Sequence, residues 1–366
     1  MINGTWKARL HLMDVRTLIK KEVREQEGYL TDMMPYRRKM DANESPFSLP
    51  SLLKRKLFKE MENIPLNRYP EPGAALIRKR FARYYDVSHD MIMIGNGSDE
   101  LIQILCTALV SSSSSVMIPT PTFVMYRIIA SITGHRIAEV PLTASFDLDL
   151  NAMLTRMSAD APVLTFISYP NSPTSNCFSE KSITAIVESS PGIVVIDEAY
   201  GGFAGKTFLP LLKKYDNLVI LKTLSKVGLA AMRIGFLIGS PILVHELDKV
   251  RLPYNINTLS QIAAGFYLDH IDAFLDQTRE IIAGREELLR ALGKIAGIHP
   301  YPSDANFIFF SCDFDTDNIY SLLAQERILV KNLNSPGVLK NCMRVTVGKR
   351  EENEDFLKVL KKILLK

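Results

Sequence analysis

Ser98, Asn171, Asp197 and Lys226 are residues that could carry out chemistry, and each follows closely on a short apolar run of the sequence. Taken singly, each has an ordinary structural interpretation: a helix N-cap, a turn, a helix start and a surface lysine. In open parallel sheets, ligands bind beyond the carboxyl ends of the strands. If the apolar runs are strands of one such sheet, these four side chains form one site.

An amine, a carboxylate and an amide in one site suit chemistry at an amine-bearing carbon. Such chemistry needs an electron sink, and the protonated pyridine ring of pyridoxal 5′-phosphate (PLP) is one. Lys226, which is followed by a mostly apolar stretch at 227–232, could form the imine with the PLP aldehyde and shuttle the proton. Asp197 could hold the pyridine nitrogen protonated. Asn171 and Tyr200 could hydrogen-bond the phenolic oxygen of the ring.

The phosphate of PLP has a candidate site at residues 97–99, where backbone amides would lie at a helix N-terminus. Ser225 could add a hydroxyl to this site and Arg233 a cation. Two carboxylates, Asp99 and Glu100, fall in the first turn of the same helix. They favour the helix dipole, but they must point away from a phosphate or repel it.

Several other kinds of site are disfavoured. Residues 95–100 begin like a dinucleotide fingerprint but have Glu100 in place of the third glycine, and residues 201–207 are one residue short of a P-loop. The six histidines are isolated, so no metal site is expected. The four cysteines lie far apart without a C-x-x-C pair, which argues against a zinc ribbon or a disulfide framework.

The composition is that of an ordinary globular protein. Hydrophobic residues make up 47% and charged residues 23% of the 366 residues, and the formal net charge is only +4. Basic residues are scattered among the acidic ones, so no nucleic-acid partner is expected. No run approaches the ~18 apolar residues of a membrane span. The N-terminus does not read as a signal peptide, and we expect a cytoplasmic location.

Seven short apolar runs, most of them separated by stretches of helical spacing, predict the main fold. They lie at residues 91–94, 116–118, 137–140, 163–168, 193–196, 218–221 and 234–238. Runs that are apolar on both faces and alternate with helices predict an α/β protein with a mostly parallel seven-stranded sheet flanked by helices.

A second, smaller unit is expected toward the C-terminus. Helical patterns dominate from about Pro241, and strand-like runs follow at 306–311, 328–330 and 343–347. We therefore predict three parts: an N-terminal arm with part of the small domain (1–60), a large PLP-binding domain (61–275) and a C-terminal small α/β domain (276–366).

An ordered set of motifs resembles the class I/II, fold type I PLP-dependent aminotransferases, and is most similar to their histidinol-phosphate branch. The similarity runs from about Pro35 to Glu352. The motifs are Asn43-Glu44-Ser45-Pro46, Arg68-Tyr69-Pro70, Gly97-Ser98-Asp99-Glu100, Pro121-Thr122-Phe123, Pro170-Asn171-Ser172-Pro173-Thr174, Asp197-Glu198-Ala199-Tyr200, Ser225-Lys226, Arg233 and Arg344-Val345-Thr346-Val347-Gly348.

The resemblance implies a role for each of these motifs around PLP. Lys226 would be the Schiff-base lysine, Asp197 the partner of the pyridine nitrogen, and Phe123 would stack on the ring. Asn171 and Tyr200 would contact the ring oxygen. The residues around the phosphate would be Ser98, Asp99, Ser225 and Arg233, joined by Tyr69 from the neighbouring subunit of a homodimer.

The resemblance also implies the substrates and their contacts. Arg344 would bind the anion of the substrate, with Tyr36 and Asn43 nearby. The substrates would be a phosphorylated amino alcohol, histidinol phosphate, and glutamate, with imidazole acetol phosphate and 2-oxoglutarate as their keto partners in histidine biosynthesis. Structural interpretations of the same residues stay open: Phe123 as a core aromatic, Tyr36 as a loop residue, and Arg344 as a partner of Glu351 or Glu352.

Two departures from the family pattern stand out. Ser175 replaces the glycine that usually follows Pro-Thr, and the interval of seven residues from Lys226 to Arg233 is one residue tighter than expected. Alternative activities are an aromatic or broad amino-acid aminotransferase and a threonine-phosphate decarboxylase. A PLP-sensing transcription regulator is disfavoured because the residues before Arg68 are too few and too unpatterned for a helix-turn-helix unit and a linker.

Overall fold

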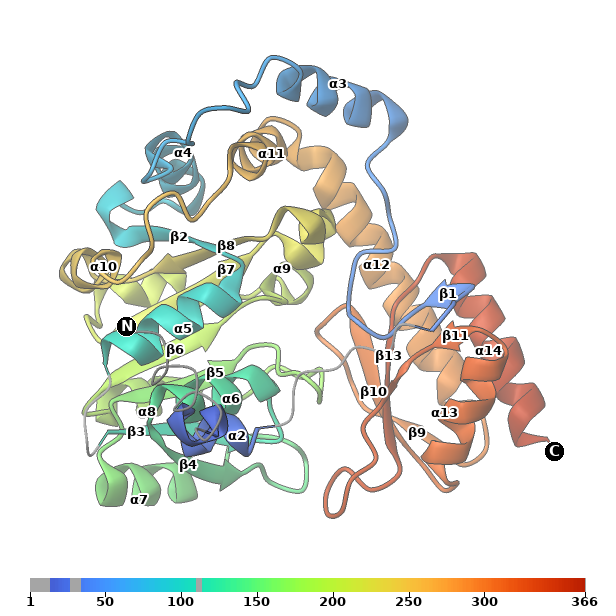
Figure 1. Ribbon diagram of the computed structural model, residues 1–366. Helices are drawn as coiled ribbons and strands as arrows, with labels where there is room; N and C mark the ends of the chain where they lie inside the picture. Colours follow the sequence, from blue (N-terminus) through green and yellow to red (C-terminus); the bar gives the residue numbers. More distant parts are fainter. Residues whose placement is uncertain (1–13, 27–33, 110–113, 366) are drawn as a thin grey trace, which may run out of the picture.

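The computed structural model describes residues 14–26, 34–109 and 114–365. Its larger sheet has seven strands in the order β2-β8-β7-β6-β5-β3-β4 (Figure 1). The strands are β2 Ile92–Asn96, β3 Ser115–Thr120, β4 Arg136–Pro141, β5 Leu164–Ser168, β6 Ile193–Asp197, β7 Leu218–Thr223 and β8 Ile234–Ile238.

Each of the seven apolar runs forms one of these strands, so the predicted sheet is confirmed. Strands β3 to β7 pair in parallel, whereas β8 is antiparallel to both of its neighbours, β7 and β2. The sheet is therefore mixed but mostly parallel. The carboxyl ends of β2, β5, β6 and β7 consequently lie at one edge.

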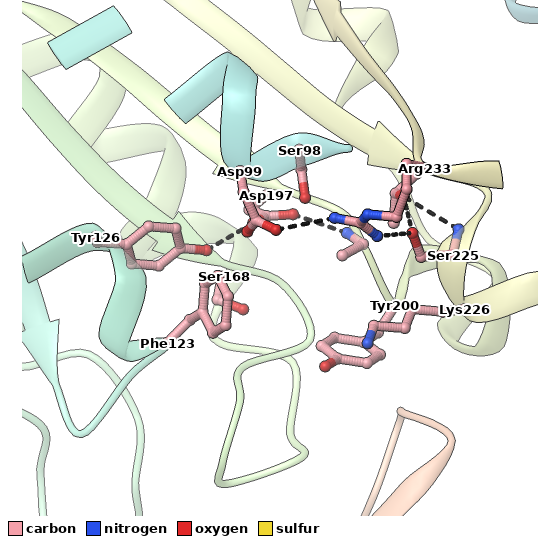
Figure 2. A pocket seen from close by; sticks show the side chains of 12 residues that line it. Ser98, Asp99, Phe123, Tyr126, Ser168, Asp197, Tyr200, Ser225, Lys226 and Arg233 are labelled. Atoms are coloured by element: carbon pink, nitrogen blue, oxygen red, sulfur yellow. Dashed lines mark hydrogen bonds and ion pairs between the residues drawn. The ribbon is translucent and has the colours of Figure 1, made fainter. Parts of the chain in front are cut away.

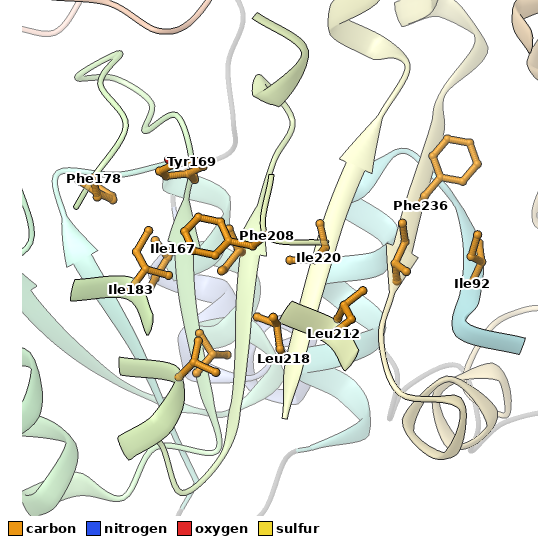
Figure 3. Packing of buried hydrophobic residues seen from close by; sticks show 14 of the residues in the cluster. Ile92, Ile167, Tyr169, Phe178, Ile183, Phe208, Leu212, Leu218, Ile220 and Phe236 are labelled. Atoms are coloured by element: carbon orange, nitrogen blue, oxygen red, sulfur yellow. The ribbon is translucent and has the colours of Figure 1, made fainter. Parts of the chain in front are cut away.

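Helices cover both faces of this sheet, as expected for strands that are apolar on both sides. Alternate residues of β6 belong to different cores: Val194 and Ile196 pack with helices α4, α7 and α8, and Val195 packs with α5, α6 and α10. Figure 3 shows part of the first core. The helices are α4 Ala75–Tyr85, α5 Ser98–Ala108, α6 Val124–Thr133, α7 Leu150–Asp160, α8 Glu180–Ser189, α9 Gly201–Ala204, α10 Pro241–Asp248 and α11 Thr258–Asp269.

The smaller unit is an antiparallel sheet with helices on it. Its strand order is β12-β13-β10-β9, from β9 Ile298–Pro300, β10 Phe307–Cys312, β12 Lys331–Asn332 and β13 Cys342–Thr346. Helices α12 Ile271–Leu292, α13 Thr316–Gln325 and α14 Arg350–Leu364 belong to this part of the molecule. The expected run at 328–330 forms β11 Ile328–Leu329, which pairs outside the sheet with β1 Arg38–Lys39.

The N-terminal arm joins the two units. It comprises the short helices η1 Val15–Leu18 and α2 Lys21–Arg24, strand β1, and helix α3 Ser51–Met61. From β1 in the small unit, the chain runs back to α3 beside α11 of the large unit (Figure 1). The predicted boundary near residue 275 lies inside the continuous helix α12, and the three-part division stays a prediction.

Among the residues that the structure describes, none of the helices combines the length and apolar character needed to cross a bilayer. Within the same ranges, no three His, Cys, Asp or Glu side chains come together as a possible metal site.

Candidate active site

A pocket opens at the carboxyl edge of the large sheet, where the ends of β5, β6 and β7 meet the N-terminus of α5 (Figure 2). Most of the predicted site residues line it. The lining residues are Ser98, Asp99, Phe123, Tyr126, Ser168, Asp197, Ala199, Tyr200, Thr223, Ser225, Lys226 and Arg233.

Asp197 is the last residue of β6 and is buried. Its Oδ2 accepts a hydrogen bond from the Tyr126 hydroxyl at 2.8 Å, and its Oδ1 accepts one from the Ala199 amide at 3.0 Å. Burial raises the pKa of Asp197 to about 6, and the two hydrogen bonds act against this rise. A buried carboxylate that is costly to ionise alone is suited to hold a cationic ring nitrogen.

Lys226 follows β7 in a turn that is not regular helix. Val227 and Gly228 have non-helical backbone angles, and Gly228 has a φ of +110°. The Lys226 amine donates to the carbonyl oxygen of Ala42 at 3.2 Å and lies 5.7 Å from the ring centre of Tyr200. The amine is therefore held at the pocket wall beside Tyr200 (Figure 2).

The Tyr200 hydroxyl is held by the N-terminal arm. Tyr200 is buried, and its Oη accepts a hydrogen bond from Asn43 Nδ2 at 2.9 Å. Its ring packs edge-on against Phe307 of β10, with 5.0 Å between the ring centres. Tyr200 thus lies where the large sheet, the small sheet and the arm meet.

Ser225, Arg233 and Asp99 form a hydrogen-bonded group at the N-terminus of α5. Arg233 donates to Ser225 Oγ at 3.1 Å and to Asp99 Oδ2 at 3.1 Å. Gly97 and Gly235 allow this approach: a Cβ on Gly97 would lie 2.5 Å from the Arg233 guanidinium. The tight interval from Lys226 therefore still brings Arg233 to the pocket, with a left-handed φ of +51°.

The two acidic residues at the start of α5 are directed differently: Asp99 lines the pocket, whereas Glu100 is not among the lining residues. The Glu100 carboxylate accepts from the Asn96 amide at 2.5 Å and from Asn255 Nδ2 at 2.8 Å. The Asp99 carboxylate pairs with Arg233. Both acidic groups thus have partners, and the Arg233 cation lies between Asp99 and Ser225.

Asn171 is fully buried, but it is not among the residues that line the pocket. Its amide nitrogen donates to the Pro121 carbonyl at 3.0 Å and to Thr174 Oγ1 at 2.8 Å, and its Oδ1 accepts from Thr122 at 2.8 Å. Both amide hydrogens are therefore used within the protein. A contact from Asn171 to a ring oxygen would require one of these bonds to be exchanged.

Ser175, the departure at the usual glycine, adopts a left-handed φ of +67°. That backbone conformation explains why glycine suits the position. The Ser175 amide donates to the Asn171 carbonyl at 2.8 Å, so the turn closes with serine as well.

Arg344, on β13, links the small sheet to the large one. Its guanidinium donates to Ser172 Oγ at 3.1 Å and to the Asp41 carbonyl at 2.7 Å, and it lies 5.2 Å from the ring centre of Phe307. The carboxylate of Glu352 accepts from the Lys349 amide at the start of α14. Arg344 thus lies at the junction of the two sheets, within reach of the loop that follows β5.

The three aromatic residues with predicted contacts, Phe123, Tyr69 and Tyr36, lie in different parts of the structure. Phe123 lines the pocket and packs edge-on against Tyr126, with 5.4 Å between ring centres. Tyr69 is 81% exposed and stacks on Tyr254 at 4.5 Å, outside the pocket of its own chain. Tyr36 is 53% exposed in the N-terminal arm.

Sequence reasoning gave no role to four residues that line the pocket: Tyr126, Ser168, Ala199 and Thr223. Ser168 and Thr223 end β5 and β7, so the strand-end rule that found Asp197 could have found them. Tyr126 has no such signal, because it comes from inside α6 and reaches Asp197 only through the packing of that helix.

The class I and II aminotransferase family matches residues 39–360. The chain is 46% identical over 326 residues to histidinol-phosphate aminotransferase 2 of Nitrosococcus oceani, covering 88% of this chain and 91% of that protein. It is 38% identical over 344 residues to the histidinol-phosphate aminotransferase of Aquifex aeolicus, covering 94% and 97%.

The fold agrees with these relatives. The crystal structure of histidinol-phosphate aminotransferase from Sinorhizobium meliloti in complex with PLP matches with a TM-score of 0.85 at 21% identity, over 95% of this chain and 97% of that one. The chain therefore belongs to the class I and II aminotransferases, which use PLP. Within that class it is a member of the histidinol-phosphate aminotransferase family.

The residues of the pocket fit PLP. A buried carboxylate, Asp197, can face a pyridinium nitrogen, and the Lys226 amine can reach an aldehyde. At the N-terminus of α5, Gly97 leaves room for the backbone amides, and the hydroxyl and guanidinium of Ser225 and Arg233 lie beside them. This donor set suits a phosphate dianion.

Proposed function

We propose that the pocket carries out amino transfer between histidinol phosphate and 2-oxoglutarate, giving imidazole acetol phosphate and glutamate. The observation that carries this proposal is the set of Lys226, Asp197, Ser225 and Arg233 around one pocket, in a chain 46% identical to a histidinol-phosphate aminotransferase. The reaction belongs to histidine biosynthesis.

When bound, PLP supplies the electron sink for breaking the C–H bond next to the substrate nitrogen. Lys226 holds the cofactor covalently and then moves the proton at that carbon. Its amine is suited to both tasks because it faces the pocket beside Tyr200 and, among the described residues, hydrogen-bonds to a backbone carbonyl, which it can leave.

Asp197 and Tyr200 adjust the charge of the ring in this proposal. Asp197 holds a proton on the ring nitrogen, since an ionised carboxylate in a buried site favours a facing cation. Tyr200 donates to the phenolic oxygen, and Asn171 joins it if one amide hydrogen is released from its present partners. Phe123 covers a face of the ring from the pocket wall.

The phosphate is held by the backbone amides of Ser98 and Asp99 at the α5 N-terminus, with the hydroxyls of Ser98 and Ser225 and the guanidinium of Arg233. Arg233 is already oriented by Asp99, so it can grip the phosphate with little further ordering. A planar guanidinium binds an oxyanion through two parallel hydrogen bonds.

Arg344 binds the anion of either substrate: the phosphate of histidinol phosphate or a carboxylate of glutamate. Two of its partners, Ser172 and the Asp41 carbonyl, are neutral, so an anion can take one of their places. Tyr36 closes over the substrate from the exposed arm. The family resemblance places Asn43 near the substrate as well.

The active unit is proposed to be a homodimer located in the cytoplasm. Tyr69 is exposed and does not line the pocket of its own chain, and it stacks on Tyr254; Leu66 and Leu252, close to these two residues in the sequence, are exposed as well. Covering these groups with a second copy would carry Tyr69 toward the phosphate of the partner's cofactor.

The test is an assay of purified protein with PLP, 2-oxoglutarate and one amino donor at a time. Glutamate should form rapidly with histidinol phosphate and slowly with phenylalanine or tyrosine. Good activity with the aromatic donors alone would favour an aromatic aminotransferase. Release of carbon dioxide from threonine phosphate would favour the decarboxylase.

A further inference from the structure

Three consecutive residues of the N-terminal arm each contact one side chain of the proposed active site. In this segment, 41–43, the first carbonyl accepts from Arg344 at 2.7 Å and the second from Lys226 at 3.2 Å. The third residue, Asn43, donates from its side chain to the Tyr200 hydroxyl at 2.9 Å. Only this last contact is made by a side chain, so only it can be changed without altering the backbone.

The side-chain amide of Asn43 has one orientation in this environment. Asn43 is 1% exposed and has a left-handed φ of +55°. The Thr346 hydroxyl accepts the Asn43 backbone N–H at 3.0 Å and gives its own hydrogen to Asn43 Oδ1 at 3.2 Å. Asn306 Nδ2 donates to the Asn43 carbonyl at 3.0 Å. With Oδ1 held by Thr346, the amide nitrogen must face Tyr200.

This orientation decides where the single hydroxyl hydrogen of Tyr200 can go. A phenol oxygen that accepts a hydrogen bond from an amide keeps its own hydrogen for another acceptor. Tyr200 lines the pocket, whereas Asn43 is buried and is not among the lining residues. We propose that Asn43 is a positioning residue that turns the Tyr200 hydroxyl hydrogen into the pocket, toward the phenolic oxygen of bound PLP.

This role differs from the substrate contact expected for Asn43, and it rests on the proposed role of Tyr200. Asn43→Asp keeps the size of the side chain and tolerance of the left-handed backbone, but a carboxylate can only accept. The Tyr200 hydrogen would then turn away from the pocket. The phenolic oxygen of PLP would lose a donor, so the linkage nitrogen on Lys226 would keep its proton to higher pH.

The readout is the visible absorption spectrum of the PLP-bound protein as a function of pH, without substrate. The charged groups around the pocket, Asp99, Asp197, Lys226 and Arg233, are the same in every variant. Tyr200→Phe should raise the pH midpoint of the spectral change by about one to two units, the effect of one hydrogen bond to a charged group. Asn43→Asp should raise it at least as far.

Two neutral variants separate positioning from an added charge. Thr346→Val removes the hydroxyl that fixes the side-chain amide of Asn43. It should raise the midpoint by less than Asn43→Asp does, and it keeps the test available where Asn43→Asp folds poorly. Asn43→Gly keeps the left-handed backbone. Added to Tyr200→Phe, it should leave the pH midpoint where Tyr200→Phe alone puts it. The control is Asn353→Asp, a buried asparagine that bonds Gly348, which should leave the midpoint unchanged.

The outcomes distinguish this inference from the function on which it rests. An unchanged midpoint in Tyr200→Phe would overturn the role of Tyr200 itself. A shifted midpoint in Tyr200→Phe, with wild-type midpoints in both Asn43→Asp and Thr346→Val, would overturn only the positioning role. An equal shift from Asn43→Gly with and without the Tyr200 hydroxyl would also overturn it, because Asn43 would then act by another path.

Discussion

At the scale of single residues, the proposed chemistry depends on a carboxylate that is kept where it is costly to ionise. Burial raises the pKa of Asp197 to about 6 from its ordinary 3.8. Between these two pH values, the folded cofactor-free protein binds a proton that the unfolded chain has released. The stability contributed by this group is therefore present below about pH 4 and is lost as the pH rises through 6.

Asp197→Asn should make the cofactor-free protein more stable at pH 8 while damaging turnover. The variant keeps the shape of the side chain and can still accept from the Ala199 amide, but it has no charge to bury. The gain should be roughly 3 kcal/mol at pH 8 and should shrink toward zero at pH 4. Urea unfolding of both proteins at both pH values measures it. A gain that is the same at pH 4 and pH 8 would refute the assignment of this titration to Asp197.

The positions of site residues could be predicted from the sequence where they follow from a strand end, and not where they follow from packing. Asp197 ends β6 and Lys226 lies three residues after β7, and the structure places both at one pocket. Tyr126 reaches Asp197 from the middle of a helix, which no local pattern indicates. Two of the three side-chain hydrogen bonds that occupy Asn171 involve a loop about 50 residues away in the chain.

At the scale of elements, the seven strands of the large sheet could be predicted because strands buried on both faces leave short, continuous apolar runs. Of the two-residue strands β1, β11 and β12, only β11 falls in a predicted run, and its partner could not be predicted, because β1 meets β11 across 290 positions of the chain. Their pairing depends on how the arm returns to the small unit, which their own residues do not specify.

The contact between β8 and the start of α5 gives an element-scale prediction. A Cβ on Gly235 would lie 2.5 Å from the Gly97 carbonyl carbon and 2.6 Å from the Ser98 nitrogen, both backbone atoms. Gly235→Ala must therefore shift the α5 N-terminus away from Arg233. We expect PLP affinity to fall on the order of tenfold to a hundredfold, as for the loss of one hydrogen bond to a charged group.

Fluorescence titration of cofactor-free protein with PLP measures this change. The matched control is Gly202→Ala, where a Cβ would meet only Val227 at an ordinary 3.7 Å, and which should bind PLP like the wild type. If Gly235→Ala also binds PLP with wild-type affinity, the α5 N-terminus is not the phosphate site.

At the scale of the whole molecule, the proposed homodimer places each active site across two chains. Lys226 lines the pocket of its own chain, and Tyr69 is exposed and outside that pocket, so in this proposal Tyr69 serves the partner's pocket. Dimers formed from Lys226→Ala and Tyr69→Phe chains then have one site with both defects and one with neither. Each variant alone has a defect in both of its sites.

Mixing the two variants, after mild unfolding and refolding together, should restore activity. Random pairing makes about half of the dimers mixed, so the activity recovered should approach a quarter of that of the wild type, far above the Lys226→Ala protein alone. Light scattering should show one dimeric species. A fully active monomer, or no recovery on mixing, would contradict the shared site.

The central claim is that this chain is an aminotransferase that recognises its amino donor by a phosphate, and the most direct measurement is kcat/KM for histidinol phosphate against histidinol. The two donors differ only in the phosphate group. If Arg344 grips that group, the ratio should exceed about one hundred, which needs roughly 2.8 kcal/mol of transition-state binding, within the range of a charged hydrogen-bonded contact. A ratio near one, with good turnover of phenylalanine or tyrosine, would contradict the account.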